Sequence, residues 1–201
     1  YTIDKENSIG IFTLNECVLN DEYKNTLKSF FDEVRENGIS VVAVDLRENG
    51  GGNSLVINEF FRYLDVDGYS VFGGMDVRSG DKLKSYPQED EKNHKVKEPF
   101  GGEVYALTSN YTFSSAMNFA VAISDNNIGK IIGEMPGNMP SHYGDKLTFQ
   151  CPDSGLLISV SYKRFHRADS SKDDLPLIPD IEVEADRAVD TLYEIAAKGE
   201  K

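Results

Sequence analysis

The stretch that decides the fold is Ser40-Val-Val-Ala-Val-Asp-Leu-Arg-Glu-Asn-Gly-Gly-Gly-Asn53. Its first part is apolar at every position from Val41 to Val44, which is typical of a parallel strand covered by helices on both faces. Three glycines follow, and a second helix is expected to begin at Asn53 or Ser54. The stretch therefore predicts a strand-to-helix turn at the carboxyl end of a central strand, where open α/β sheets bind ligands.

Strand-like and helical segments alternate on both sides of this stretch. Strands are expected at 8–14, 40–46, 69–72, 103–108, 130–133, 146–151 and 156–162, and helices at 20–38, 53–64, 114–124 and 184–198. This alternation predicts an α/β fold with a mostly parallel central sheet, helices packed on it and a short β-hairpin region. In the second helix, Leu55, Val56 and Phe60 are expected to point inward. Charged residues crowd 79–100, which we expect to be an exposed insert within a single domain spanning 1–201.

Composition limits the classes of partner. The chain has 201 residues and a formal net charge of −13, so its surface repels nucleic acid and anionic lipid. No apolar run is long enough to span a bilayer, and no signal peptide opens the chain, which we expect to be a fragment of a longer protein. Cys17 and Cys151 fit no metal spacing. Two free thiols are expected, with one long-loop disulfide as the alternative, and no metal or cofactor is predicted.

A second turn carries a candidate nucleophile. The segment Thr112-Phe113-Ser114-Ser115-Ala116 also joins a buried strand to a helix. A serine at a helix N-terminus lies beside free N–H groups and the positive end of the helix dipole, which stabilise an oxyanion. The alternative is that Ser114 only caps its helix. Together the two turns offer a hydroxyl and bare backbone amides at one end of a sheet, which is the arrangement that acyl transfer needs.

Four segments in order resemble one family. They are Asp45–Gly52 (DLRENGGG), 104–120 (VYALTSNYTFSSAMNFA), 131–137 (IIGEMPG) and 177–183 (LIPDIEV). They are similar to signature segments of the C-terminal processing, or tail-specific, serine proteases, over a span from Ile9 to about Val183. The resemblance implies a crotonase-like, Clp-protease-like fold and an extracytoplasmic location. It also implies a polypeptide substrate and a peptide-gating domain upstream.

The resemblance also implies roles for individual residues. Ser114 matches the nucleophile of the family, and the amides of Gly51 (or Gly52) and Ser115 match its oxyanion hole. These assignments agree with the chemistry that the two turns offer.

The general base is where the chain departs from the family pattern. Many relatives place a lysine after the Gly-Glu segment, but residues 133–144 contain none. In another branch the base is a histidine, and Asp173 or Asp174 occupies the position of its acidic partner; each is otherwise a charged loop residue. The histidine would then lie upstream of Tyr1, or it is His142, otherwise a loop residue. Tyr143 is a candidate for binding the substrate backbone.

The sequence thus predicts a serine endopeptidase that cleaves exposed or unstructured polypeptide through an acyl-enzyme on Ser114. The missing lysine supports an alternative, a non-catalytic peptide-binding module on the same fold. A crotonase-type acyl-CoA enzyme is a third reading, although no basic cluster for adenine or phosphate is visible. His166, between basic neighbours, is expected at the surface. The sequence does not predict an oligomeric state.

Overall fold

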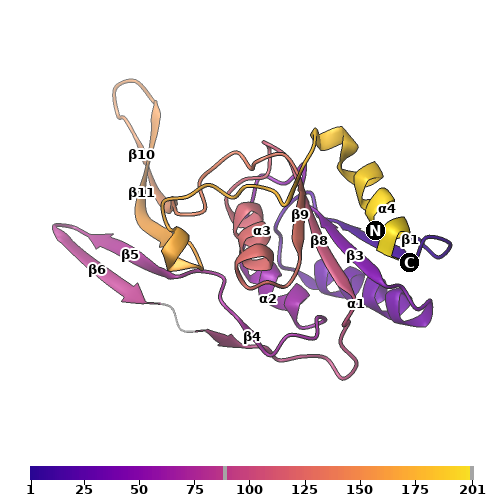
Figure 1. Cartoon of the computed structure of the whole chain (residues 1–201). Coiled ribbons are helices and arrows are strands. Elements are labelled where there is room, and N and C mark those ends of the chain that lie inside the picture. Colours follow the sequence, from indigo (N-terminus) through magenta and orange to yellow (C-terminus); the bar gives the residue numbers. More distant parts are fainter. Residues whose placement is uncertain (88–89, 200–201) are drawn as a thin grey trace.

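The computed structural model describes residues 1–87 and 90–199 and builds this part of the chain around a six-stranded sheet (Figure 1). The strand order is β1-β2-β3-β8-β9-β12, with bounds β1 Thr2–Asp4, β2 Ile9–Thr13, β3 Val41–Asp45, β8 Glu103–Thr108, β9 Lys130–Gly133 and β12 Ile181–Glu182. All neighbours in this order pair in parallel except β1, which runs antiparallel to β2. The predicted α/β class with a mostly parallel sheet is confirmed.

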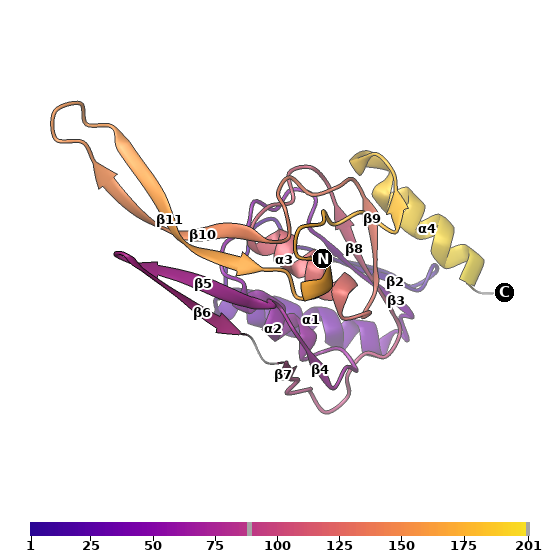
Figure 2. The ribbon, with the colours of Figure 1, turned by 60° about the vertical axis from the view of Figure 1, so that its left-hand side comes forward.

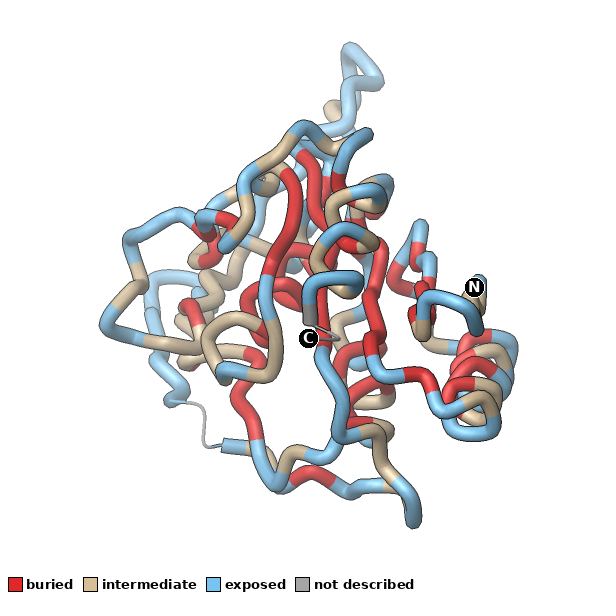
Figure 3. Tube along the Cα trace, turned by 45° about the vertical axis from the view of Figure 1, so that its right-hand side comes forward, coloured by how far each residue is buried: buried red, intermediate tan, exposed pale blue. Residues whose placement is uncertain are grey.

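Helices cover both faces of this sheet. The helices are α1 (Asp21–Glu36), α2 (Leu55–Phe61), α3 (Ser115–Asp125) and α4 (Ala188–Gly199). Alternate residues of β3 point to opposite faces, so Val42 and Val44 join a large core with α1, α2 and α3, whereas Val41 and Ala43 join a smaller core with α4. Figure 2 shows α4 on one side of the sheet and α1 and α2 on the other. In Figure 3 the continuous buried segments follow these central strands.

The helix predicted at 20–38 is confirmed, because the local signal that predicted it, a capping residue before a helical apolar pattern, is present in the structure. The Asn20 side chain accepts a hydrogen bond of 2.8 Å from the backbone N–H of Tyr23 at the N-cap.

The prediction that the Leu55 side chain points inward is wrong, because this residue is 55% exposed. It is the first residue of a short helix and faces a surface cavity, whereas Val56 and Phe60 are buried as predicted.

A second, antiparallel sheet stands beside the body in the order β10-β11-β5-β6. Its strands are β10 (His142–Gln150), β11 (Leu157–His166), β5 (Gly74–Ser79) and β6 (Lys82–Pro87). The hairpin predicted over 146–162 is confirmed, with longer strands, and it extends away from the body in Figures 1 and 2.

The charged insert expected at 79–100 contains β6 and β7 (Glu91–Lys92), although β5, the partner of β6, begins upstream of it. Gln88 and Glu89 lie outside the described residues. The strand expected at 69–72 is reduced to β4 (Gly68–Tyr69), which pairs with β7. Two short 3₁₀ helices, η1 (Ser170–Lys172) and η2 (Ala185–Arg187), complete the elements. Among the described helices, none has the length and apolarity that a membrane span requires.

A histidine cluster ties the second sheet to the C-terminal segment. The His166 ring lies between Asp76 of β5 (Nε2 to Oδ2, 3.0 Å) and Asp173 (Nδ1 to Oδ1, 3.3 Å). The surface position expected for His166 holds only in part, since 25% of its side chain is exposed. Hydrogen bonds from Ser85 and His166 hold the pKa of Asp76 below its ordinary value. Partial burial raises the pKa of Asp173, but hydrogen bonds from Ser141, His166 and the Arg167 N–H outweigh it and lower the pKa overall.

We expect the lowered pKa values of Asp76 and Asp173 to make the free energy of unfolding depend on pH. Groups whose pKa is lowered by folding stabilise the folded state above their unfolded pKa, and this contribution is lost as the pH falls through the folded value. The melting temperature should therefore decrease as the pH is lowered below about 4. This decrease should be less steep in Asp173→Asn than in the parent protein. The matched control is Asp174→Asn, because the Asp174 side chain is 92% exposed. Parallel curves for all three proteins would contradict the prediction.

Candidate active site

The two strand-to-helix turns meet at the carboxyl ends of β3 and β8, which are paired neighbours. The Thr112 hydroxyl donates to the Leu46 carbonyl at 2.9 Å, and the Phe113 N–H donates to the Asn49 carbonyl at 3.0 Å. The Ser115 hydroxyl donates to the Gly52 carbonyl at 2.7 Å. These bonds join the glycine turn and the serine turn into one unit at one edge of the sheet.

Asn49 organises the glycine turn from inside. Its side chain is fully buried; Nδ2 donates to the Leu14 carbonyl at 2.7 Å, and Oδ1 accepts from the Gly51 N–H at 2.8 Å. Nearby, Arg47 forms a two-pronged ion pair with Asp45 and donates to the Ala185 carbonyl at 2.8 Å. The Asn49 and Arg47 side chains therefore hold the glycine turn in place through hydrogen bonds within the protein.

Ser114 has an unusual backbone conformation. It precedes α3 with φ 53° and ψ −120°, whereas a capping serine is normally extended, and its side chain makes no capping hydrogen bond. Its N–H donates to Asn138 Oδ1 at 3.0 Å. Such a backbone costs about 1–3 kcal/mol, and residues with this conformation cluster at functional sites. A strained strand-to-helix turn presents the nucleophile in α/β-hydrolases. Ser114 therefore occupies the N-cap position of α3 without capping the helix through its side chain.

Two backbone amides beside Ser114 are free to bind an anion. Within residues 1–87 and 90–199, the N–H groups of Gly52 and Ser115 have no hydrogen-bond acceptor. Ser115 is the first residue of α3, so its N–H also lies at the positive end of the helix dipole. The Gly51 N–H, the other donor considered from the sequence, is already bonded to Asn49. The geometry thus favours Gly52 over Gly51 as the glycine donor.

Gly51 leaves room for Ser114. A Cβ atom built on Gly51 would lie 2.7 Å from Ser114 Cβ and 3.1 Å from the Ser115 nitrogen, and the residue has φ +106°. Both the contact and the backbone conformation exclude a side chain here.

For the peptidase predicted from the sequence, we therefore expect Gly51→Ala to lower kcat/KM by about 100-fold, because a displacement of even 1 Å at the predicted nucleophile has this effect. Stability should fall by roughly 2 kcal/mol because of the positive φ. Peptidase assays and thermal unfolding would measure both effects. Gly50→Ala is the matched control, since a Cβ there has no neighbour within 4 Å. Equal activity of the two variants would contradict this packing argument.

A surface cavity of about 590 Å³ opens over the serine turn. Its lining consists of Gly52, Asn53, Ser54, Leu55, Phe72, Ser114, Ser115, Asn118, His142, Gly144, Asp145, Lys163 and Phe165. The hydroxyl and the free amides therefore border one space, which also includes a histidine and a lysine. Within the described part of the chain, no cluster of three or more His, Cys, Asp or Glu side chains could hold a metal ion.

Comparison with known proteins agrees with this geometry. The family model described as Peptidase family S41 matches residues 8–183. The chain belongs to this family. The family resemblance found from the sequence is thereby confirmed. No curated protein matched the chain in a sequence search.

Solved structures support the S41 fold. The photosystem II D1 C-terminal processing protease is 20% identical with a TM-score of 0.61, over 88% of this chain and 42% of that one. A peptidase structure from Parabacteroides merdae ATCC 43184 is 16% identical with a TM-score of 0.71, over 95% of this chain and 62% of that one. Mature CPAF is 14% identical with a TM-score of 0.69, over 94% and 50%. The S41 chain thus spans about half the length of these structures.

His142 is the histidine that the S41 chain places in the serine cavity. Its Nδ1 lies 2.9 Å from the Pro140 carbonyl, which can only accept, so Nδ1 carries the proton. In the neutral ring Nε2 is then unprotonated, which is the tautomer that a general base requires. Of the three histidines in the sequence, it is the one that borders Ser114.

Lys163 was missed by the sequence analysis. It borders the same cavity, and its Nζ lies 2.6 Å from Asp145 Oδ2, an interaction that raises the pKa of Lys163. At neutral pH it is therefore an ammonium and cannot accept a proton from Ser114. The signal lay in the predicted hairpin, because antiparallel pairing sets Lys163 opposite Gly144, close to His142.

The remaining sequence candidates lie elsewhere. Asp173 is bonded to Ser141, His166 and the Arg167 N–H rather than to His142. Asp174 is highly exposed and reaches Arg164 at 3.5 Å. Tyr143 is 71% exposed and borders a different cleft. Neither aspartate nor Tyr143 lines the serine cavity, and their predicted roles stay predictions.

Proposed function

We propose that the chain is the catalytic region of a serine endopeptidase that cleaves exposed or unstructured polypeptide through an acyl-enzyme on Ser114. Membership in a peptidase family supports peptidase function in general. The observation that carries the serine mechanism is the strained backbone of Ser114, whose uncapped side chain borders a cavity together with the free amides of Gly52 and Ser115. An extracytoplasmic location, as the family resemblance implies, is part of the proposal.

The geometry suggests the following steps. Ser114 Oγ attacks the carbonyl carbon of the substrate as a base removes its proton, and the carbonyl oxygen becomes an oxyanion between the amides of Gly52 and Ser115. The C–N bond breaks, and the base returns the proton to the leaving amine. Water then attacks the ester by the same route and releases the acid. The strained backbone and the fixed donors need no rearrangement at either step.

His142 is our candidate for the base. It borders the cavity, its tautomer is correct, and Lys163 is held protonated by Asp145. One observation favours the alternative, a peptide-binding module without turnover: within the described chain, no carboxylate is bonded to His142. The family assignment gives no support to an acyl-CoA enzyme.

A fluorophosphonate probe tests the mechanism, since it reacts with an activated serine. We expect labelling of the full-length protein at Ser114, located by peptide mass spectrometry. His142→Gln should slow labelling and peptide hydrolysis by about 100-fold or more. Lys163→Met, which removes a protonated group, should change either rate by less than about tenfold. Absence of label at Ser114 would reject the serine mechanism, and equal labelling of His142→Gln would reject His142 as the base.

A further inference from the structure

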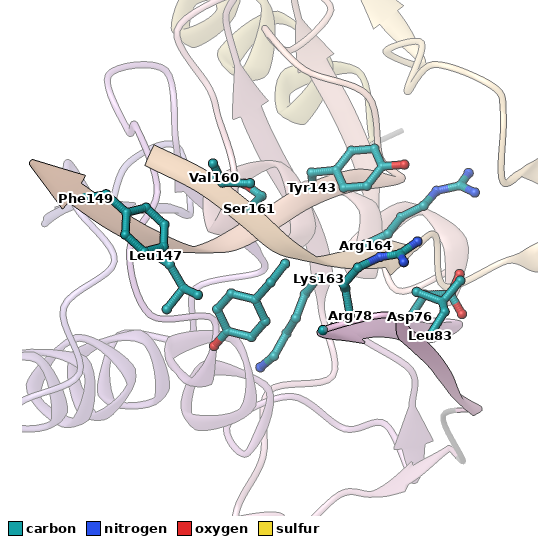
Figure 4. A pocket seen from close by; sticks show the side chains of 12 residues that line it. Asp76, Arg78, Leu83, Tyr143, Leu147, Phe149, Val160, Ser161, Lys163 and Arg164 are labelled. Atoms are coloured by element: carbon teal, nitrogen blue, oxygen red, sulfur yellow. The ribbon is translucent and has the colours of Figure 1, made fainter. Parts of the chain in front are cut away.

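A second hollow, of about 600 Å³, lies on the outer face of the antiparallel sheet. Figure 4 shows it from close by: Leu147 and Phe149 of β10 and Val160 of β11 lie toward one end, and Asp76, Arg78 and Arg164 toward the other. We call this hollow the hairpin cleft. It is not one of the surfaces that bind the two helix layers to the central sheet.

The apolar end of the cleft is exposed to an unusual degree. Leu147, Phe149 and Val160 are 55%, 57% and 53% exposed, and Tyr143 and Leu83 in the same cleft are 71% and 57% exposed. Because side chains alternate along a strand, and Leu83 of β6 pairs with Arg78 of β5, these residues gather on one face of the antiparallel sheet. Their exposed area is on the order of 500 Å², which is the size of the largest apolar patch on a typical monomer, and such patches are often functional. The face therefore fits a partner with apolar side chains.

The other end of the cleft carries the cationic side chains Arg78 and Arg164 in a protein of net charge −13. Arg78 forms no ion pair within the described residues, and Arg164 reaches its acidic partners only at 3.3 and 3.5 Å. The single acid in the lining, Asp76, is held by His166 and Ser85. Among the described residues, Arg78 is therefore the cation of this cleft without an ion-pair partner, and it fits an acidic side chain of the partner.

The hairpin cleft adjoins the serine cavity. Lys163 borders both hollows, and β10 places His142 in one and Tyr143 in the other. β10 is an edge strand of its sheet, so an extended chain bound in the serine cavity can continue around this edge into the cleft. This continuity favours the substrate as the occupant.

We propose that the hairpin cleft is an accessory binding site for the polypeptide substrate, and that it takes an extended apolar segment bearing an acidic side chain, away from the scissile bond. This proposal rests on the proposed function of the Ser114 site. It predicts that long apolar substrates bind more tightly than short ones of the same cleavage sequence.

Equilibrium binding tests the proposal without catalysis. The protein is the full chain with Ser114→Ala, and the probe is a fluorescent peptide of about 14 residues, rich in leucine and alanine with one central glutamate. We expect the double variant Leu147→Ser, Phe149→Ser to weaken binding by about tenfold or more, since buried apolar anchors dominate such interfaces. Arg78→Glu should remove the preference for this peptide over one with a central lysine. Leu157→Ser, on the opposite face of the hairpin and 70% exposed, is the matched control and should bind as the parent does.

Two results would overturn the proposal. One is unchanged peptide binding by the double variant. The other is a concentration-dependent dimer, seen by sedimentation, that the double variant abolishes, because the cleft would then be covered by a second copy of the chain. Failure of the fluorophosphonate test would reject the serine mechanism but would leave this binding measurement intact, so the two failures are distinguishable.

Discussion

Replacing Ser114 with alanine is expected to lower kcat for peptide hydrolysis by about 10⁴-fold or more, the loss found when a hydrolase loses its nucleophile. The free amides of Gly52 and Ser115 stay in place in this variant, so substrate binding should change little. Hydrolysis of an unfolded, fluorogenic protein substrate by the full-length enzyme would measure the loss. Residual activity above about a tenth of the parent value would reject Ser114 as the nucleophile.

The same position should show a trade-off between activity and stability. Because φ is 53° at Ser114, a glycine there relieves strain, and Ser114→Gly should be inactive yet more stable by about 1 kcal/mol. Asn127→Gly is the control, since Asn127 has φ 54° and lies outside the serine cavity. It should keep full activity. A loss of stability in Ser114→Gly would contradict the view that the turn stores strain.

Arg167→Ala is expected to destabilise the protein by about 3–5 kcal/mol, as is usual when one partner of a buried ion pair is removed. Arg167 Nη2 and Nε each lie 2.8 Å from a carboxylate oxygen of Asp125, at the end of α3, and the two side chains are only 4% and 1% exposed. Arg167 also donates to the carbonyls of Leu175 and Pro176. Removing it leaves a buried carboxylate and two unpaired carbonyls.

Chemical denaturation would measure this loss, with two controls. Lys172→Ala removes a 42%-exposed partner of the same Asp125 at 3.7 Å and should cost less than about 1 kcal/mol. The double variant Arg167→Met, Asp125→Leu removes both charges and should recover much of the stability. A loss as small as that of Lys172→Ala would show that the pair contributes little.

The fold was largely predictable because its signals are local. The apolar run at Val41–Val44 predicts a buried strand, and the helical spacing after Asn20 predicts a helix with one buried face. Both predictions are confirmed. The length of β10 and β11 was not predictable, since their outer residues are exposed apolar side chains with no layer above them. The contact of His166 with Asp76 was not predictable either, because the two residues are 90 positions apart in the sequence.

The site divides in a similar way. Motif and turn chemistry predict Ser114 and the glycines as site residues, because both signals lie in short stretches of chain. The preference for Gly52 over Gly51 depends on a buried hydrogen bond from Asn49, and the presence of Lys163 depends on the register of a hairpin. These are tertiary properties that no short pattern carries.

The hydrogen bond from the buried Asn49 amide to Leu14 links the glycine turn to the N-terminal part of the chain. Asn49 Nδ2 donates to the carbonyl of Leu14, immediately after β2, so one of the bonds that hold the glycine turn requires the N-terminal strand to be in place. Partial unfolding that detaches β2 from the sheet would therefore break one of the bonds that shape the turn beside Ser114.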